Sequence, residues 1–319
     1  MTVMTVTDAI SQALAEEMRA DPRVVMFGEG VATQRRDLVA EFGGKRVRNT
    51  PLAEGIIAGA AAGAAATGLR PVIDLLFAPF LCLSMDELVN SAGKLRYISG
   101  GQFSFPLVTL AMTGSGWTVG AQHNHNIEAW FVHSPGIKVV MPSNPADFKG
   151  LLKAAIRDDN PVMYFIDMAL SYAEGEVPDG DHVVPLGVAA TVREGTDVTL
   201  ISYAKMVGTC LQAAEALAAD GISAEVIDLR SLSPLDEATF LASARKTGRV
   251  VVVHEASRTC GVGAEVAATI AEKAFSSLKA PVVRVTGPDT PPPSSYALEM
   301  AFMPQPDGVA SAARGLVQA

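Results

Sequence analysis

The sequence predicts two α/β domains, each built on a doubly wound parallel sheet. In its first half, short apolar runs alternate with segments of helical periodicity, which is the pattern of a parallel sheet covered by helices. A second alternation follows an acidic stretch rich in Gly and Pro. A length of 319 residues also suits two domains of ordinary size. We therefore expect a first domain over 1–175, a linker over 176–192 and a second domain over 193–319.

The first domain begins with an amphipathic helix. Ile10, Leu14 and Met18 recur at helical spacing, and Pro22 ends the pattern. The strands expected to follow are the apolar runs 23–27, 71–76, 106–112, 137–141 and 161–166.

Three further helices of this domain are expected between those strands. Asn144 followed by a proline predicts a helix start, and Ser84 with Glu87 forms a capping box before another helix. The helix over 52–67 is dominated by Ala and Gly, and Gly59 and Gly63 give it a smooth face. Such a face suits internal packing or a subunit interface, and the sequence leaves both open.

The second domain repeats the alternation with shorter spacing. Its predicted strands are 198–203, 224–229, 250–253 and 282–285, and its predicted helices are near 206–219, 235–246, 263–277 and 307–317. Gly261 and Gly263 stand between a strand and a helix, as in dinucleotide-binding loops, but the third glycine of that motif is missing. The pair therefore favours a tight strand-to-helix turn.

Composition excludes several classes of partner. A net charge of −9 and a pI of about 5.1 argue against binding nucleic acid or an anionic membrane surface. Only 18% of residues are charged and 49% are hydrophobic, which favours apolar surface buried by other subunits over an Ala-rich core alone. Cys82, Cys210 and Cys260 form no close pair. This usage, without a signal peptide or spanning segment, predicts a reducing compartment, the cytoplasm.

Two features point to chemistry. Glu54 is the one carboxylate of the apolar 52–67 helix, so it either complements the helix dipole or meets a specific partner. His123, His125 and His133 lie within eleven residues, after a strand and a glycine-rich loop. This arrangement favours a catalytic loop over a metal site, because no cysteine or carboxylate stands at ligand spacing. Walker, G-x-S-x-G and H-E-x-x-H motifs are absent from the sequence.

Long segments of the chain also resemble one known family. They are GEGVA at 28–32, NTPLAEGIIAGAAAGAAATGLRP at 49–71, SAGKLRYISGGQFSFPLV at 91–108, GAQHNHNIEAWFVHSPGIKVVMPSNPADFKGLLKAAIRDDNPV at 120–162, VIDLRSLSPLD at 226–236, KTGRVVVVHEA at 246–256 and RVTGPDTPPP at 284–293. This ordered set resembles the β subunits of the E1 component of 2-oxoacid dehydrogenase complexes, which are transketolase-like thiamine enzymes acting on pyruvate, branched-chain 2-oxoacids or acetoin.

The resemblance implies roles for single residues. Glu54 matches the carboxylate that bonds N1′ of the aminopyrimidine of thiamine diphosphate, and Glu29 is a further cofactor contact. Phe80 matches the aromatic residue that stacks on the pyrimidine, although it would otherwise be interpreted as an ordinary core residue. His123 matches the histidine that assists acyl transfer to lipoamide. A monovalent-cation site, for K+, is implied at Leu107, Ala155, Ile156, Asp158 and Asn160, where helix capping by the last two is compatible.

One half of the family's cofactor site is missing from the sequence. Thiamine enzymes hold the diphosphate and Mg2+ through a Gly-Asp-Gly segment followed by an Asn, and no such segment occurs here. We therefore expect an α-type E1 subunit to supply that half in an α2β2 heterotetramer. The second domain is expected to serve assembly and to dock the acyltransferase (E2) core.

The implied activity is decarboxylation of a 2-oxoacid such as pyruvate, with transfer of the acyl group to lipoamide. The chain reads His123-Asn124-His125 where the family commonly has His-Ser-Gln, and its 32–46 stretch is shorter and lacks the usual glycines. Both departures leave an acetoin-cleaving or a biosynthetic, carbon–carbon bond-forming enzyme as alternatives. Retention of Glu54, Phe80 and His123 argues against a non-catalytic scaffold.

Overall fold

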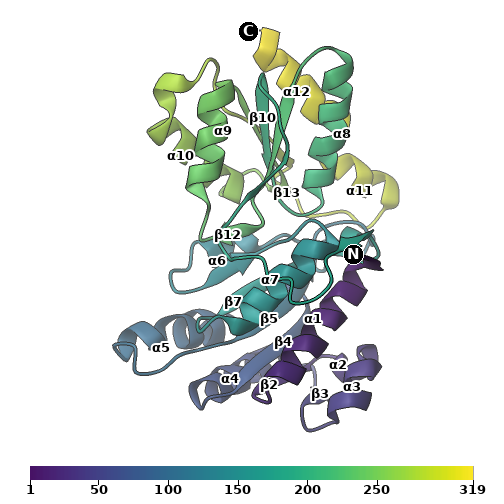
Figure 1. Ribbon diagram of the computed structural model, residues 1–319, viewed down its shortest axis with the longest axis vertical. Coiled ribbons are helices and arrows are strands. Elements are labelled where there is room, and N and C mark those ends of the chain that lie inside the picture. The colour runs from purple at the N-terminus through teal and green to yellow at the C-terminus, as the bar shows by residue number, and fades with distance from the viewer. Residues whose placement is uncertain (319) are drawn as a thin grey trace. The chain divides into compact units, whose positions relative to one another are not determined.

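The computed structural model describes residues 1–318, which form two compact units. The first unit comprises Met1–Thr113 and Trp130–Leu186, and the second comprises Gly114–Ala129 and the chain from Gly187 onward. Residues 114–129 thus fold with the second unit, although the chain on both sides of them belongs to the first. Figure 1 labels the elements of both units.

The first unit is built on a parallel sheet whose strands run in the order β3, β2, β4, β5, β7, β6. Non-consecutive neighbours require helical crossovers, so the predicted doubly wound parallel sheet is confirmed. The strands are β2 (Val24–Gly28), β3 (Val47–Asn49), β4 (Arg70–Phe77), β5 (Val108–Thr113), β6 (Lys138–Val140) and β7 (Val162–Asp167).

The predicted helices accompany this sheet, together with short helices that the sequence did not predict. The principal helices are α1 (Val6–Ala20), α2 (Val31–Gln34), α3 (Arg36–Phe42), α4 (Glu54–Ala66), α5 (Gly93–Ile98), α6 (Glu128–Val132) and α7 (Pro145–Arg157). Of these, the short α2, α3 and α6 were not predicted. The predicted cap of α7 is confirmed, because Asn144 Oδ1 accepts from the Asp147 N–H at 3.0 Å. Buried apolar residues of α1 and α7 pack together against the strands in one core.

The predicted capping box at Ser84 and Glu87 is wrong. Ser84 ends a 3-10 helix (Ala78–Ser84), and its hydroxyl donates to the Leu81 carbonyl at 3.1 Å. An N-cap needs extended backbone, whereas the residue that precedes the next helical segment, Met85, already has helical φ and ψ. That segment, Asp86–Ala92, is a π-helix that runs directly into α5.

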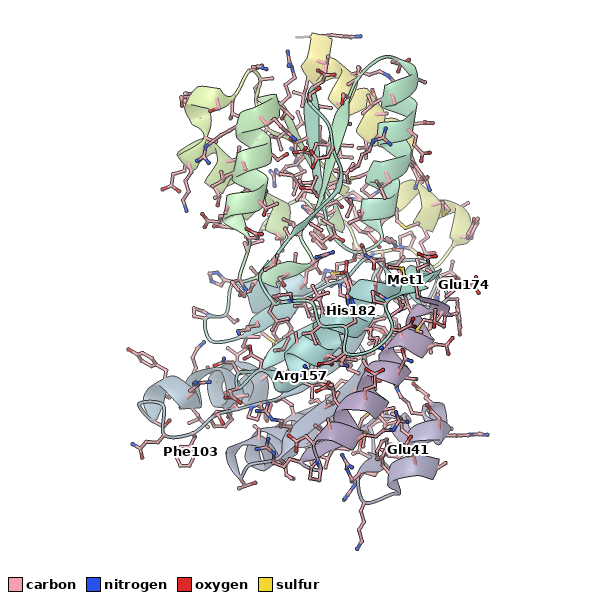
Figure 2. All side chains as sticks on the ribbon, in the orientation of Figure 1. Met1, Glu41, Phe103, Arg157, Glu174 and His182 are labelled. Atoms are coloured by element: carbon pink, nitrogen blue, oxygen red, sulfur yellow. The ribbon has the colours of Figure 1, made fainter. Side chains whose placement is uncertain are left out.

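Ion pairs fix the acidic end of the first unit. Strand β8 (Glu174–Val177) pairs with β1 (Thr2–Thr5) in an antiparallel ribbon. Beyond it, Asp181 lies 2.7 Å from both Lys153 Nζ and Arg157 Nη2 on α7, and Arg157 also pairs with Glu17 of α1. Figure 2 labels Arg157. The carboxyl pKa of Asp181 is lowered, because it accepts hydrogen bonds from these two cations. The start of the predicted linker is therefore ordered against the helices.

The second unit is a separate doubly wound sheet in the order β14-β13-β10-β11-β9. All of its pairings are parallel except that of β9, an antiparallel edge strand that the sequence did not predict. The elements are β9 (Ala190–Arg193), β10 (Val198–Ser202), β11 (Ala224–Asp228), β13 (Val250–Ser257), β14 (Val283–Gly287), α8 (Met206–Ala219), α9 (Glu237–Thr247), α10 (Val262–Lys273), α11 (Tyr296–Phe302) and α12 (Pro306–Gln318).

The glycines before α10 are needed for close packing. A Cβ on Gly261 would lie 2.7 Å from the His254 ring, and one on Gly263 would lie 2.5 Å from it. His254 itself is fully buried at the end of β13. The Gly-x-Gly pair therefore makes the tight strand-to-helix turn that the sequence favours. Over residues 1–318, no helix combines the length and hydropathy required to cross a bilayer.

Candidate active site

Glu29 stands at the carboxyl end of β2, where parallel sheets commonly place their sites. Its backbone N–H donates to the Asp74 carbonyl of β4 at 3.0 Å. Gly28 makes this approach possible: its φ is +151°, and a Cβ there would lie 2.1 Å from that same carbonyl oxygen. Glu29 is thereby held in the sheet edge with only 6% of its surface exposed.

The Glu29 carboxyl group is perturbed. Burial, and then the nearby charges of Glu54 and Asp74, together raise its pKa to about 7. Its Oε1 atom has no hydrogen-bond partner among the described residues. Because a buried polar atom is normally satisfied, a carboxyl group with an unpartnered oxygen and a raised pKa suits a ligand that supplies the missing hydrogen-bond partner.

Asp74 and Arg35 support this edge, and the sequence reasoning missed both. Burial raises the pKa of the Asp74 carboxyl, and the charge of the buried Arg35 opposes that shift. Asp74 Oδ1 also accepts from the Leu76 N–H at 3.1 Å, which holds Leu76 at a φ of 59°. The signal for Asp74 was its position as the one charge in the apolar run PVIDLL. Arg35 lies in a polar stretch without any such signal.

Glu54 is the first residue of α4 and is half-buried. Its first-turn position places the carboxylate where the helix dipole favours negative charge. Its charge acts on Glu29, so these two predicted residues come together at one edge of the sheet. Phe80, also half-buried, lies in the 3-10 helix that follows β4. The three residues thus come from segments that follow β2, β3 and β4, which are neighbours in the sheet.

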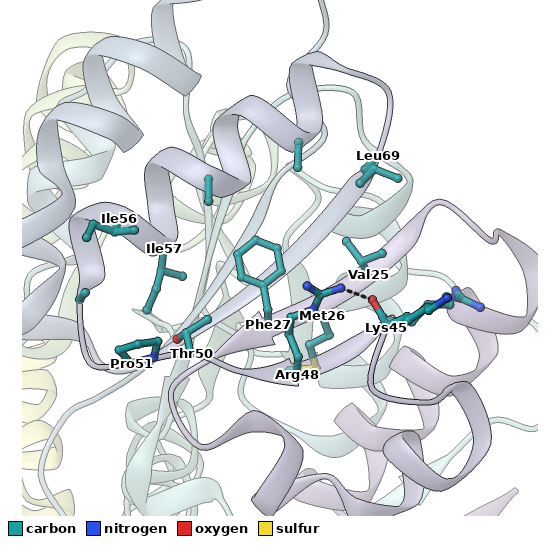
Figure 3. A pocket seen from close by; sticks show the side chains of 14 residues that line it. Val25, Met26, Phe27, Lys45, Arg48, Thr50, Pro51, Ile56, Ile57 and Leu69 are labelled. Atoms are coloured by element: carbon teal, nitrogen blue, oxygen red, sulfur yellow. Dashed lines mark hydrogen bonds between the residues drawn. The ribbon is translucent and has the colours of Figure 1, made fainter.

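A cavity of about 480 Å³ lies between α4 and strands β2 and β3 (Figure 3). Phe27, Ile57 and Ala64 are among its mostly apolar lining residues, and Arg48 at its edge donates to the Lys45 carbonyl at 2.6 Å. It contains none of the predicted site residues. Pro51 and Ala53, which precede Glu54 in the chain, do line it.

The segment 114–129, called here the histidine loop, carries the second set of predicted residues in the second unit. A turn at Gly120, with φ of 82°, presents His123, whose N–H donates to the Gly120 carbonyl at 3.1 Å. Burial lowers the pKa of His125, which lines an open cavity with Thr259 and Asp289. His133 lies exposed in the first unit and does not belong to this loop. Within residues 1–318, no group of three or more His, Cys, Asp or Glu side chains could hold a metal ion.

The oxygens of the predicted monovalent-cation site already accept hydrogen bonds. Arg70 Nη1 donates to the carbonyls of Ile156 and Asp158 at 2.9 and 3.1 Å, and Arg96 Nη1 donates to Asn160 Oδ1 at 2.9 Å. Burial would raise the pKa of the Asp158 carboxyl, but hydrogen bonds from Lys138 and Asn160 outweigh it, so the pKa is lowered. The other two residues also have partners: Leu107 O accepts from Val162 N at 2.8 Å, and Ala155 O accepts from Asp158 N at 3.3 Å. The carbonyls of Leu107, Ala155, Ile156 and Asp158 therefore have protein donors, and a monovalent cation at this turn stays a prediction.

Comparisons with known proteins identify both halves of the chain. Residues 2–169 match the transketolase pyrimidine-binding domain, and residues 187–309 match the transketolase C-terminal domain. The chain is 44% identical to the pyruvate dehydrogenase E1 component subunit beta-2, mitochondrial, of Oryza sativa subsp. japonica, over 98% of this chain and 85% of that protein. It is also 44% identical to the 2-oxoisovalerate dehydrogenase subunit beta of Bacillus subtilis, over the whole of both chains.

The chain belongs to the family of E1 β subunits of 2-oxoacid dehydrogenases. This confirms the resemblance drawn from the sequence. The acetoin:2,6-dichlorophenolindophenol oxidoreductase subunit beta of Cupriavidus necator is a further relative, 44% identical over 96% of this chain and 95% of that protein.

Solved structures support the fold of an E1 β-type chain. A split-gene transketolase, described as an inactive β4 tetramer, is 27% identical and superposes with a TM-score of 0.83, covering 99% of this chain and 98% of that one. A transketolase mutant of Pichia stipitis, 17% identical, has a TM-score of 0.73 and covers all of this chain and 47% of that one, which shows the shared fold alone. The transketolase-like fold class is therefore confirmed.

The E1 β family depends on thiamine diphosphate, and the glutamate edge fits its aminopyrimidine. That ring carries both acceptor nitrogens and an amino group, so a carboxylate and a protonated carboxyl are suitable neighbours. Glu54 offers the first and Glu29, with its raised pKa and unpartnered Oε1, offers the second.

Replacing Glu29 with Gln is expected to change how stability depends on pH. Its folded pKa of about 7 exceeds the ordinary value of 4.5, so between these values the folded chain binds a proton that the unfolded chain lacks. Stability from this group is present below pH 4.5 and is lost as the pH rises towards 7. As the pH rises from 4.5 to 7, the free energy of unfolding of Glu29→Gln should therefore increase by about 1–3 kcal/mol relative to that of the unsubstituted chain. Urea unfolding at each pH measures this difference. The exposed Glu215→Gln is the control, and parallel curves for Glu29→Gln and the unsubstituted chain would contradict the raised pKa.

Proposed function

We propose that this chain is the β subunit of a thiamine-diphosphate-dependent 2-oxoacid dehydrogenase, active only with an α-type subunit. The reaction removes CO2 from a 2-oxoacid such as pyruvate and transfers the remaining acyl group to lipoamide. The observation that carries the proposal is the pair formed by Glu54 and the buried Glu29 at one edge of the sheet. Burying a carboxyl group near a second one costs free energy, which a sheet edge with only a structural role would avoid.

The residues of the first unit would bind and orient the cofactor. Thiamine diphosphate, when bound, supplies a nucleophilic carbon and an electron sink for decarboxylation. Glu54 would hold the proton at N1′ of the aminopyrimidine, which favours the imino tautomer of that ring. Glu29, with a pKa of about 7, would be protonated below neutral pH and would then act as a hydrogen-bond donor. Phe80 would cover the face of the pyrimidine with its apolar ring.

Binding of the diphosphate and Mg2+ is assigned to the partner. The chain has no Gly-Asp-Gly segment followed by an Asn. An α-type E1 subunit in an α2β2 heterotetramer would complete the site, and the second unit would dock an acyltransferase (E2) core. K+ would have to share its ligands with Arg70, Arg96 and Lys138, so we assign it no step in the reaction. Cytoplasmic localisation is part of the proposal.

Acetoin cleavage is the second candidate function. Two β subunits of acetoin:2,6-dichlorophenolindophenol oxidoreductases, from Cupriavidus necator and Bacillus subtilis, are 44% and 41% identical to this chain. The same cofactor edge would serve a substrate that loses an aldehyde instead of CO2. A screen of the α/β complex with pyruvate, branched-chain 2-oxoacids and acetoin separates the two functions, because only the former substrates release CO2. Products longer than the substrate would favour carbon–carbon bond formation instead.

His123→Gln tests the assignment of the acyl-transfer step. We expect acyl transfer to lipoamide to fall about 10²-fold, because the imidazole would no longer supply or orient a proton for the acceptor thiolate. Reduction of an artificial dye, which needs no acyl acceptor, should change much less. His133→Gln, an exposed histidine in the first unit, is the matched control. Equal losses in both assays would argue that His123 acts before acyl transfer.

A further inference from the structure

The histidine loop is tied to the second unit at its start by a buried ion pair. Glu255 Oε1 accepts from the Ser115 N–H at 2.6 Å, and Lys205 Nζ donates to the Ser115 carbonyl at 2.5 Å. Lys205 also lies 2.5 Å from Glu255 Oε2, with side chains 9% and 3% exposed. The Lys205–Glu255 ion pair therefore binds both the N–H and the carbonyl of Ser115, which fixes the position of the start of the loop.

The middle of the loop is held by Glu299 on α11. Glu299 is 1% exposed, and its Oε1 accepts from Asn124 Nδ2 at 2.7 Å and from the Thr118 N–H at 3.2 Å. Asn124 is fully buried, although both of its neighbours are histidines that are partly exposed. Thr118 has a φ of 54°, a conformation that a β-branched residue rarely adopts without such support.

A third contact fixes the end of the loop. The Tyr203 hydroxyl donates to Glu128 Oε1 at 2.7 Å, and both residues are buried. The ring of Tyr203 stacks on the His254 ring with centroids 6.1 Å apart. Between these two fixed ends, at 115 and 128, Glu299 supplies a buried side-chain contact in the middle of the loop. That contact lies at the residue between His123 and His125.

We propose that Asn124 and Glu299 are positioning residues, whose buried hydrogen bond sets how the histidine loop presents His123 and His125 to the acyl acceptor. The proposal rests on the proposed function, because it concerns the acyl-transfer step. It also gives the Asn of the altered His-Asn-His motif a role, because its amide donates to Glu299. Glu299 acts through Asn124 and Thr118 and touches neither reactant nor cofactor in this role.

Exchanging the amide and the carboxylate between positions 124 and 299 tests the contact. Asn124→Asp places two buried carboxylates next to each other and removes the hydrogen-bond donor. The contact between the loop and Glu299 should therefore be lost. In the double variant Asn124→Asp/Glu299→Gln, the new amide at 299 donates to the new carboxylate at 124. The hydrogen bond between these positions returns with its direction reversed. The Thr118 N–H, which shares the Oε1 position with Asn124, then loses its acceptor. Asn90→Asp is the matched control, because exposed Asn90 donates to Asp86 in the same way outside this loop.

The first measurement uses the assembled α/β complex. We expect Asn124→Asp to lower acyl transfer to lipoamide between about tenfold and about a hundredfold, because misplacement of a reacting group by about 1 Å costs this much. Dye reduction should fall less than about threefold. The double variant should recover part of the loss, because it restores the contact at 124 but not the one at Thr118, whereas Asn90→Asp should behave as the unsubstituted enzyme. Equal loss in both assays, or a double variant no better than Asn124→Asp, would overturn the proposal.

The second measurement needs no turnover. Hydrogen exchange on the full-length chain should show the amides of 116–124 exchanging at least about tenfold faster in Asn124→Asp and returning towards normal in the double variant. If the unsubstituted complex acts on no 2-oxoacid and no acetoin, the proposed function fails, and this exchange pattern still decides whether the contact positions the loop. Unchanged exchange in Asn124→Asp would overturn the positioning role whatever the activity.

Discussion

Glu54→Gln is expected to lower turnover of the α/β complex by about 10²–10⁴-fold, the range over which a positioned proton-transfer group acts. Gln keeps the size of Glu54 and its place in the first turn of α4, but it cannot hold a proton at N1′. Protein folding should be unaffected, because the side chain is half-buried at a helix end and not in the core. Steady-state rates with the preferred substrate measure the effect.

The control for Glu54→Gln is Glu237→Gln. Glu237 is also the first residue of a helix, α9, and it pairs with Lys273 on the surface of the second unit. Both substitutions remove a negative charge from a first helical turn, so any effect on the helix dipole is matched. Activity of Glu54→Gln within a few-fold of the control would show that the carboxylate has no catalytic role.

Thiamine diphosphate is expected to bind tightly to the α/β complex and weakly to this chain alone. The first unit offers residues for the aminopyrimidine, Glu29, Glu54 and Phe80, but the sequence carries no diphosphate and Mg2+ segment. The diphosphate carries most of the charge of the cofactor, so a chain that lacks its ligands should lose most of the binding energy. Calorimetry in the presence of Mg2+, on the chain alone and on the complex, measures the difference.

Each outcome of the calorimetry is informative. Tight binding by the chain alone would mean that it contains an unrecognised diphosphate site, and the heterotetramer would then no longer be required for cofactor binding. No binding by the complex would favour a scaffold that kept the fold without the cofactor. The complex carrying Glu54→Gln should still bind the cofactor, because the diphosphate contacts of the partner are intact.

Local signals in the sequence were sufficient for most elements. The spacing of Ile10, Leu14 and Met18 predicts α1, and Asn144 caps α7 as expected. These features depend on residues close together in the chain, where hydrophobic period and side-chain capping act directly. Ser84 shows where local signals fail. It is the last residue of a 3-10 helix, so its backbone is not free to form the predicted capping box.

The candidate site was found in part. A lone carboxylate in an apolar helix pointed to Glu54, and the family resemblance assigned its role. The raised pKa of Glu29 depends on burial beside Asp74 and on the charge of Glu54, which arrive from other strands of the sheet. No pattern near Glu29 in the sequence contains that information.

The sequence alone therefore determined the α/β fold class, most of the helices and strands, and Glu54 and His123 as candidates. Only the tertiary structure decided that the charge of Glu54 raises the pKa of Glu29 and that the histidine loop is held by the second unit. The contact between Asn124 and Glu299 joins residues 175 positions apart. Periodicity and capping are properties of neighbouring residues, whereas burial, charge coupling and such hydrogen bonds arise only when distant segments pack together.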